Sequence, residues 1–300
     1  MYNSNNNSIS NNVISSNFYG IYLYSSTNNI VSGNTISFNY QVGIHITFYS
    51  GNNIFYHNNL NNVNATNVKN DMMNIWDFEG EGNYWNDYDG EDLDKDGIGD
   101  TPYVLDENNQ DNYPLMGMFF AFNAVVKGEE YSIVIISNST ISNLDFKTSG
   151  EVGHGVISFI ATGANNTWGF CRIRFSRKLI EYPYVVLINE METIPKEVNV
   201  QNETYACLYF DYPHNSSISI LFSEIIKLYY GLLDNYLELQ KSFSELNSTY
   251  YTLLQANSSL SESFTKLQED LKILNSSLSD LNKTLDNFVE GYSILLENYT

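Results

Sequence analysis

The strongest pattern in the sequence is a heptad repeat of apolar side chains over residues 222–300. Leucine recurs at every seventh position from Leu232 to Leu295 except at Phe288, and the position three residues before each of these is mostly aromatic or aliphatic. This spacing forms one apolar stripe on a helix, and no proline interrupts the segment, so the pattern predicts a long α-helical coiled coil. The leucines of the predicted seam are Leu246, Leu253, Leu260, Leu267, Leu274 and Leu281.

Such a stripe is unstable on a single helix in water, so we expect it to pair with a second copy of the chain. Asn257 lies within the seam and favours a parallel register. Further Asn-x-Ser/Thr sequons begin at Asn247, Asn275, Asn282 and Asn298 and are predicted to carry glycans. The first three flank the seam, where glycans would obstruct trimers or tetramers, so we expect a parallel dimer with Asn257 unmodified.

Residues 1–70 show a second repeat, with a period of about 23 residues, in which short β-type runs alternate with asparagine pairs. The pattern predicts a parallel β-helix with Ile9, Ile30 and Ile54 pointing inward and asparagine at the corners. The aromatic content argues against a disordered asparagine-rich segment, which is the alternative. Because the repeat begins in mid-pattern, we expect this chain to be part of a longer protein.

Residues 118–221 contain six apolar runs of strand length, separated by Gly, Asn and Ser clusters, which predict an all-β sandwich. In one run Cys171, Ile173 and Phe175 alternate with Arg172 and Arg174, so we expect one buried face and one solvated face. We expect Cys171 and Cys207 to be two buried thiols, with a disulfide between neighbouring strands as the alternative. The predicted domains are therefore 1–117, 118–221 and 222–300.

Charge is distributed unevenly over these regions. Residues 1–70 contain no Asp or Glu, whereas residues 71–117 are strongly acidic with Lys95 as their one cation. The net charge of −21 argues against nucleic acid as a partner, because phosphate would be repelled. No apolar run is long enough to predict a membrane span, and no leader sequence follows Met1.

The acidic region holds a sharp motif, Asp92-Leu93-Asp94-Lys95-Asp96-Gly97-Ile98-Gly99-Asp100. Alternating carboxylates followed by a glycine turn are the spacing of calcium loops, in which side chains converge on a hard cation. The predicted ligands are Asp92, Asp94, Asp96, the Ile98 carbonyl, Asp100 and a remote carboxylate such as Asp106 or Asp89. A solvated acidic turn without metal is the alternative. A bound Ca²⁺ would act as a structural clip.

The asparagine repeats and the acidic segment together resemble NosD/CASH-type right-handed parallel β-helix proteins, particularly archaeal cell-surface (S-layer-associated) ones. The motif Asp92–Asp100 is similar to the loops of dockerins and type 3 thrombospondin repeats. The resemblance covers residues 1–117. It implies a β-helix closed by a capping segment, followed in such surface proteins by a β-sandwich module and a stalk.

The same resemblance suggests two other functions. β-Helix polysaccharide lyases and hydrolases need paired carboxyl groups, which residues 1–70 lack, so their catalytic coils would lie upstream of Met1. NosD-like copper handling would use His45 and His57 with Met72 and Met73, which suit copper as soft ligands. We expect both histidines to be surface residues instead.

The sequence thus predicts a non-enzymatic extracellular cell-surface protein with a structural or adhesive role. The aromatic and amide-rich face of the β-helix is the predicted binding surface for a surface polysaccharide.

Overall fold

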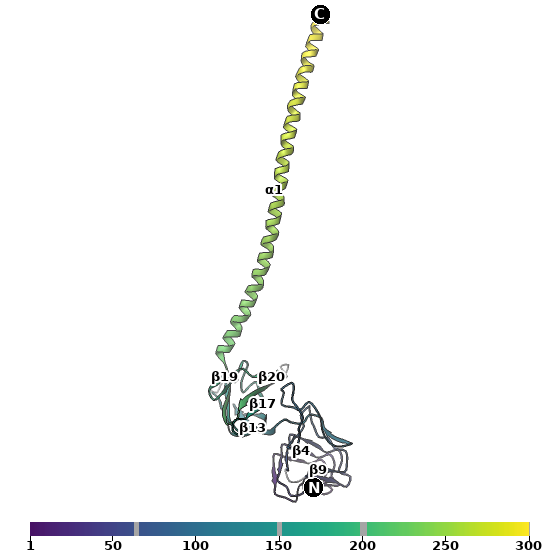
Figure 1. Ribbon diagram of the computed structural model, residues 1–300, viewed down its shortest axis with the longest axis vertical. Coiled ribbons are helices and arrows are strands. Elements are labelled where there is room, and N and C mark those ends of the chain that lie inside the picture. The colour runs from purple at the N-terminus through teal and green to yellow at the C-terminus, as the bar shows by residue number, and fades with distance from the viewer. Residues whose placement is uncertain (63–65, 149–151, 199–202, 300) are drawn as a thin grey trace. The chain divides into compact units, whose positions relative to one another are not determined.

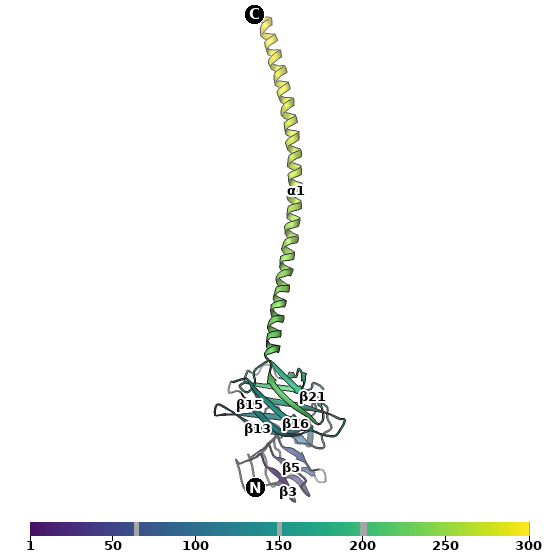
Figure 2. The same ribbon diagram turned by 90° about the vertical axis from the view of Figure 1, so that its left-hand side faces the viewer.

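The N-terminal region winds into a parallel β-solenoid of about three turns. The computed structural model describes residues 1–62, 66–148, 152–198 and 203–299 (Figures 1 and 2). The solenoid strands form three parallel sheets: β1 (Ser8–Ser10), β4 (Ile30–Ser32) and β7 (Ile54–Tyr56); β2 (Val13–Ser15), β5 (Thr35–Ser37), β8 (Asn59–Asn61) and β10 (Tyr84–Trp85); and β3 (Tyr19–Tyr24), β6 (Val42–Thr47) and β9 (Thr66–Asn70).

Ladders of asparagine, buried from the second turn onward, hold the corners of the solenoid together. The Oδ1 atom of Asn34 accepts the backbone N–H and the side-chain amide of Asn12, and Asn58 does the same for Asn34. Parallel ladders run through Asn7, Asn29 and Asn53, and through Asn17, Asn39 and Asn62. Each asparagine of the later turns therefore accepts a backbone N–H of the preceding turn at the corner, and the predicted corner role of asparagine is confirmed.

The expected set of inward aliphatic residues is wrong by one position in two turns. Val31 and Phe55 are buried, whereas Ile30 is exposed and Ile54 is only partly covered. The register pairs Ile9 with Val31 and Val31 with Phe55, so these three residues form one inward column. The ladder asparagine points inward, the next residue therefore points outward, and the one after it enters the core.

Residues 71–117 follow the last turn of the solenoid. This segment contains the antiparallel pair β11 (Tyr103–Asp106) and β12 (Asn109–Asp111). Trp76 and Trp85 are buried and join the core cluster that Val31 and Phe55 also enter. Asp111 continues one ladder, because its Oδ2 atom accepts the backbone N–H of Asn83 at 2.7 Å and the indole N–H of Trp85 at 2.9 Å.

The next region consists of two five-stranded antiparallel sheets whose facing side chains share one hydrophobic cluster (Figure 2). The first sheet has the order β13 (Met118–Val126), β14 (Glu129–Ser137), β17 (Trp168–Ser176), β21 (Tyr205–Pro213) and β20 (Lys196–Val198). The second has the order β15 (Thr140–Thr148), β16 (Gly155–Thr162), β22 (Ser216–Phe222), β18 (Tyr184–Ile188) and β19 (Met191–Thr193). The six predicted apolar runs lie in β14, β16, β17, β18, β21 and β22, whereas β13, β15, β19 and β20 were not predicted.

The outer face of the first sheet is not solvated as predicted. Arg172 is buried there, and a second apolar cluster joins β13, β14, β17 and β21 to Ile98 and Leu115 of the acidic segment. The cause is the packing of residues 71–117 on this face, which the strand's own alternation does not reveal. Cys171 and Cys207 are both buried free thiols, so the disulfide alternative does not apply.

The C-terminal region is one helix, α1 (Glu224–Tyr299), of 76 residues (Figure 1). At about 1.5 Å per residue it is roughly 110 Å long. The chain divides into two units at this helix, Met1–Lys227 and the residues from Leu228 onward. In the described residues, no helix combines the length and the apolar character that crossing a membrane requires.

Candidate functional site

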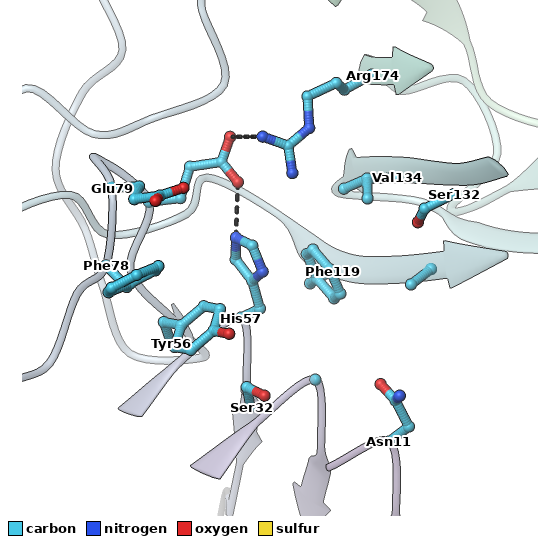
Figure 3. Close-up of a pocket in the computed structure, with 13 residues that line it drawn as sticks. Asn11, Ser32, Tyr56, His57, Phe78, Glu79, Phe119, Ser132, Val134 and Arg174 are labelled. Carbon is cyan, nitrogen blue, oxygen red and sulfur yellow. Dashed lines mark hydrogen bonds and ion pairs between the residues drawn. The ribbon is translucent and has the colours of Figure 1, made fainter. Parts of the chain in front are cut away.

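A cleft of about 320 Å³ lies between one corner of the solenoid and the outer face of the first five-stranded sheet. Figure 3 shows its lining, in which the solenoid supplies Tyr56 and His57 and the sheet supplies Phe119, Val134 and Arg174. The residues of the sheet wall are cross-strand neighbours, because Ala121 pairs with Val134 and Val134 pairs with Arg174. Regular strand pairing therefore fixes this wall.

The solenoid wall is a column of residues in the left-handed conformation. Asn11, Gly33 and His57 occupy equivalent corners of successive turns, with φ values of 58°, 68° and 57°. Asparagine and glycine enter this region easily, whereas histidine does so less often. A Cβ atom on Gly33 would lie 2.4 Å from Oδ1 of Asn11, so glycine is needed there for space as well. The corner turns these residues toward the cleft.

Aromatic rings cover much of the cleft at the His57 corner. The imidazole of His57 stacks on Phe119 with ring centroids 4.1 Å apart. The ring centroids of Tyr56 and the exposed Phe78 are 5.2 Å apart. His57 was expected at the surface, but only 13% of its side chain is exposed. The stacking on Phe119 joins the solenoid to β13, and two hydrogen bonds between Asn59 and the backbone of Phe119 reinforce the same contact.

Glu81 is a largely buried anion in the lining of the cleft. Its Oε2 atom lies 2.6 Å from Nε2 of His57, and its Oε1 atom lies 2.6 Å from Nη1 of Arg172 and 3.6 Å from Nη1 of Arg174. Burial alone would raise the pKa of Glu81, but the hydrogen bond with His57 and the charges of Arg172 and Arg174 outweigh it and hold the pKa well below its usual range. Glu81 therefore stays ionised and is suited to holding the cleft walls rather than to donating a proton.

The chemistry of the cleft is that of a binding surface with balanced charge. Arg174 and Glu79 offer a donor and an acceptor, and Asn11, Ser32 and Ser132 add uncharged polar groups beside the aromatic rings. Such a mixture recognises hydroxyl-bearing ligands by hydrogen bonds and by contact with apolar faces.

The acidic loop forms a second candidate site. Asp92, Asp94 and Asp96 each offer a carboxylate oxygen within 4.8 Å of the others, the one group of three such ligands in the described part of the chain. Asp92 accepts the backbone N–H groups of Asp96 and Gly97. Burial raises the pKa of Asp92, and the neighbouring Asp94 raises it further, against these two hydrogen bonds. The crowded oxygens fit a hard cation that would relieve this repulsion.

The predicted carboxylate ligands Asp100 and Asp106 are not part of this group. Asp100 accepts the backbone N–H of Leu93 at 2.6 Å. Asp106 lies in β11 and accepts hydrogen bonds from Asn108 and Asn109. The side chain of Ile98 is buried in the cluster under the loop.

The loop also packs on the first sheet. Lys95 forms an ion pair with Asp211 at 2.7 Å, and Lys196 donates to the backbone carbonyl of Asp94. Gly97 has a φ of +85°, and a Cβ atom there would lie 2.9 Å from the side chain of Arg172. An ion at this loop would therefore act next to the contact that buries Arg172.

The predicted aromatic face of the solenoid is present along β3 and β6. Tyr2 stacks on Tyr24 with centroids 4.6 Å apart, and Tyr24 stacks on Phe48 with centroids 4.7 Å apart. Tyr2 and Phe48 are well exposed. This stack offers flat apolar rings to solvent, in the way that sugar-binding surfaces do.

The copper candidates are not gathered in one place. His57 is engaged with Glu81, whereas His45 lies on β6 beside Tyr19 and Tyr22, at ring distances of 4.8 and 5.2 Å. Met72 and Met73 line a different cavity with Asp71 and Asp106.

The predicted seam of α1 is a row of exposed side chains. Leu246, Leu253, Leu260, Leu267, Leu274 and Leu281 are each 64–69% exposed. Asn247, Asn257, Asn275 and Asn282 are also exposed on the helix, while the side chain of Asn298 lies outside the described residues.

Glu81, Arg172 and Arg174 were not singled out as a site from the sequence. Arg172 follows Glu81 by 91 positions, and no local spacing connects them. One feature of the sequence could have indicated this site. His57 occupies the corner position at which the earlier turns have Asn11 and Gly33, and histidine adopts the left-handed conformation of that corner less often than they do.

Comparison with known families finds one match. Residues 1–90 match the family described as periplasmic copper-binding protein (NosD). No curated protein and no solved structure matches this chain. Together with the observed parallel strands, the match supports a NosD-like β-helix for residues 1–90, a likeness that covers the solenoid and not the two antiparallel sheets or α1.

Proposed function

We propose that this protein is a non-enzymatic extracellular surface protein with a structural or adhesive role. Its β-solenoid and a β-sandwich formed by the two antiparallel sheets act as a carbohydrate-binding head. Helix α1 is the stalk that joins two such chains as a parallel coiled-coil dimer.

The carrying observation is the exposed apolar stripe of α1. Its leucines are 64–69% exposed on the single helix, and the stripe continues through other apolar residues such as Phe264 and Leu271. Each buried leucine is worth roughly 1.5–3 kcal/mol, so pairing along many heptads would outweigh the entropic cost of association. Self-association through this stripe is what a stalk requires.

Paired lysine substitutions test the stalk. The variant Leu260→Lys/Leu267→Lys introduces charge into the seam and should convert the dimer to a monomer in light-scattering chromatography. The matched control Ser258→Lys/Thr265→Lys adds the same charge on the outward face, where it should leave the mass unchanged. Equal masses for the two variants would contradict a stalk that pairs through this seam.

The acidic loop supports a further part of the proposal, namely that Ca²⁺ stabilises the end of the solenoid. Asp92, Asp94 and Asp96 would hold the ion, and the loop's packing on Arg172 would transmit its effect to the sheet. Calcium should raise the melting temperature of the full chain, a chelator should reverse the rise, and Asp94→Asn should reduce it. Equal melting temperatures with calcium and with chelator would contradict a stabilising Ca²⁺ at this loop.

Copper handling is the second candidate, because the matched family is described as copper-binding. His45 is the better placed donor, since its Nδ1 atom is buried without a hydrogen-bond partner. Burial lowers the pKa of His45 and thereby favours the neutral imidazole that binds metals. A copper titration of wild-type protein and His45→Ala tests this candidate, and equal binding by both proteins would reject His45 as the ligand.

A further inference from the structure

The cleft at His57 continues into a second cavity. This cavity of about 350 Å³ shares Asn11, Gly33, Phe119 and Ala121 with the first, and it extends the groove past the solenoid corner. Phe119, Ala121 and Asn123 alternate along β13 and therefore face the groove from one side of the sheet. The two cavities thus form one elongated groove between the solenoid and β13, which we call the corner groove.

The two ends of the corner groove differ in chemistry. At one end Phe78 is 43% exposed and lies beside Tyr56, with Arg174 and Glu79 as polar partners. At the other end the lining is uncharged and hydrogen-bonding, and its polar members are Asn11, Asn12, Thr35 and Asn123. A ligand that fills the groove must present apolar faces and many hydroxyl groups along its length.

The charges around the groove select against an anionic ligand. Glu81 is compensated by Arg172, so the accessible charges are Arg174 and Glu79, one of each sign. Residues 71–117, which supply Phe78 and Glu79 to the groove, contain 14 acidic side chains against Lys95, and this excess of negative charge would repel uronic acids and phosphates. A neutral ligand meets no such cost.

Hydrogen bonds and a buried ion pair connect the two walls of the groove without any ligand. Asn59 accepts the backbone N–H of Phe119 at 2.7 Å and donates to its carbonyl at 2.9 Å. Glu81, which is part of the lining, forms a buried ion pair with Arg172. Fixed walls reduce the ordering cost of binding, so a modest number of contacts suffices for useful affinity.

We propose that the corner groove is the binding site for a neutral linear oligosaccharide, with one sugar ring on Phe78 and Tyr56 and the following rings along Asn11 and Asn123. This inference rests on the proposed carbohydrate-binding function and moves the site from the exposed aromatic stack of Tyr2, Tyr24 and Phe48 to the groove. A chain of several sugars fits an elongated groove of this kind better than a single small ligand, because the lining offers polar contacts over two joined cavities.

Calorimetric titration of the full chain with cellohexaose, mannohexaose and maltohexaose, and with hexagalacturonate as the acidic comparison, tests the inference. Phe78→Ala and Asn123→Ala alter exposed side chains of the groove, and Phe48→Ala is the matched control on the aromatic stack. We expect at least one neutral hexasaccharide to bind. Phe78→Ala should weaken it about 10-fold or more, as truncation of a central aromatic contact does, while Phe48→Ala leaves affinity unchanged.

The outcomes distinguish failure of the corner groove as the binding site from failure of carbohydrate binding as the function. Loss of affinity in Phe48→Ala but not in Phe78→Ala and Asn123→Ala would overturn the corner groove and retain carbohydrate binding by the aromatic stack. Preference for hexagalacturonate would overturn the neutral ligand. Absence of binding to all four probes would overturn the inference, and a glycan array without hits would then reject carbohydrate binding itself.

Discussion

Replacing Glu81 with glutamine tests how the solenoid and the first sheet are held together. The side chains of Glu81 and Arg172 are only 7% and 6% exposed, and their atoms approach to 2.6 Å. Glu81→Gln removes the charge but keeps the size of the side chain, so the guanidinium of Arg172 is left buried without its counter-ion. Breaking a buried pair in this way costs about 3–5 kcal/mol.

Urea unfolding at neutral pH measures this cost through the fluorescence of the buried Trp76 and Trp85. The double variant Glu81→Gln/Arg172→Met should recover much of the loss, since it removes the uncompensated charge. The matched control is Lys95→Met, which breaks a solvent-exposed pair with Asp211 and should change the free energy of unfolding little. A loss in Glu81→Gln no larger than that of the control would refute a buried, structural role for the pair.

The pH dependence of this loss has a defined sign. The pKa of Glu81 in the folded protein is lowered below its ordinary value of 4.5. The stabilisation from the ionised carboxylate is therefore fully present above that value and disappears as the pH falls through the folded pKa. The stability difference between wild type and Glu81→Gln should stay constant from neutral pH down to about 5 and shrink below it.

Three further predictions concern the ladders and the acidic loop. Burial raises the pKa of Asp111 to about 6 from 3.8, against the hydrogen bonds from Trp85 and Asn83. The free energy of unfolding of the wild type minus that of Asp111→Asn, measured in urea, should therefore fall as the pH rises between these values, and a constant difference would contradict the raised pKa. Asn58→Ala leaves the buried backbone N–H of Asn34 without its acceptor and removes the hydrogen bonds from the Asn58 side chain to Val31 and Asn83, so it should lower the free energy of unfolding in urea by about 3 kcal/mol or more. A loss below about 1 kcal/mol would show that the ladder contributes little. Gly97→Ala should be destabilising because its φ is +85° and the new Cβ meets Arg172, and a calorimetric melting temperature equal to that of the wild type would contradict this close packing.

The solenoid could be predicted from the sequence because its repeat is local. Each turn places its ladder asparagine at a corner, so the spacing of the asparagines along the sequence indicates the length of one turn. The register was harder, since Ile30 and Val31 are both aliphatic and hydrophobicity alone does not say which one enters the core. The ladder decides it, because Asn29 points inward and the strand then alternates.

The corner groove could not be predicted, because its walls come from distant parts of the chain. The alternation of Arg172 and Arg174 with apolar residues predicts a solvated face, but residues 71–117 pack on this face and bury Arg172. The acidic loop was visible because its carboxylates are neighbours in sequence, although the expected partnership of Asp100 and Asp106 with the other three is not observed. Sites formed by residues that are close in sequence can thus be predicted from this sequence, whereas contacts between its distant regions cannot.

Sedimentation equilibrium of the full chain tests the central claim most directly. The account predicts a mass twice the 34.3 kDa of the single chain at micromolar concentration, because the exposed stripe of α1 is buried only when two helices pair. A mass of 34.3 kDa over the whole concentration range would contradict the stalk, and a mass of three or four chains would contradict the dimer.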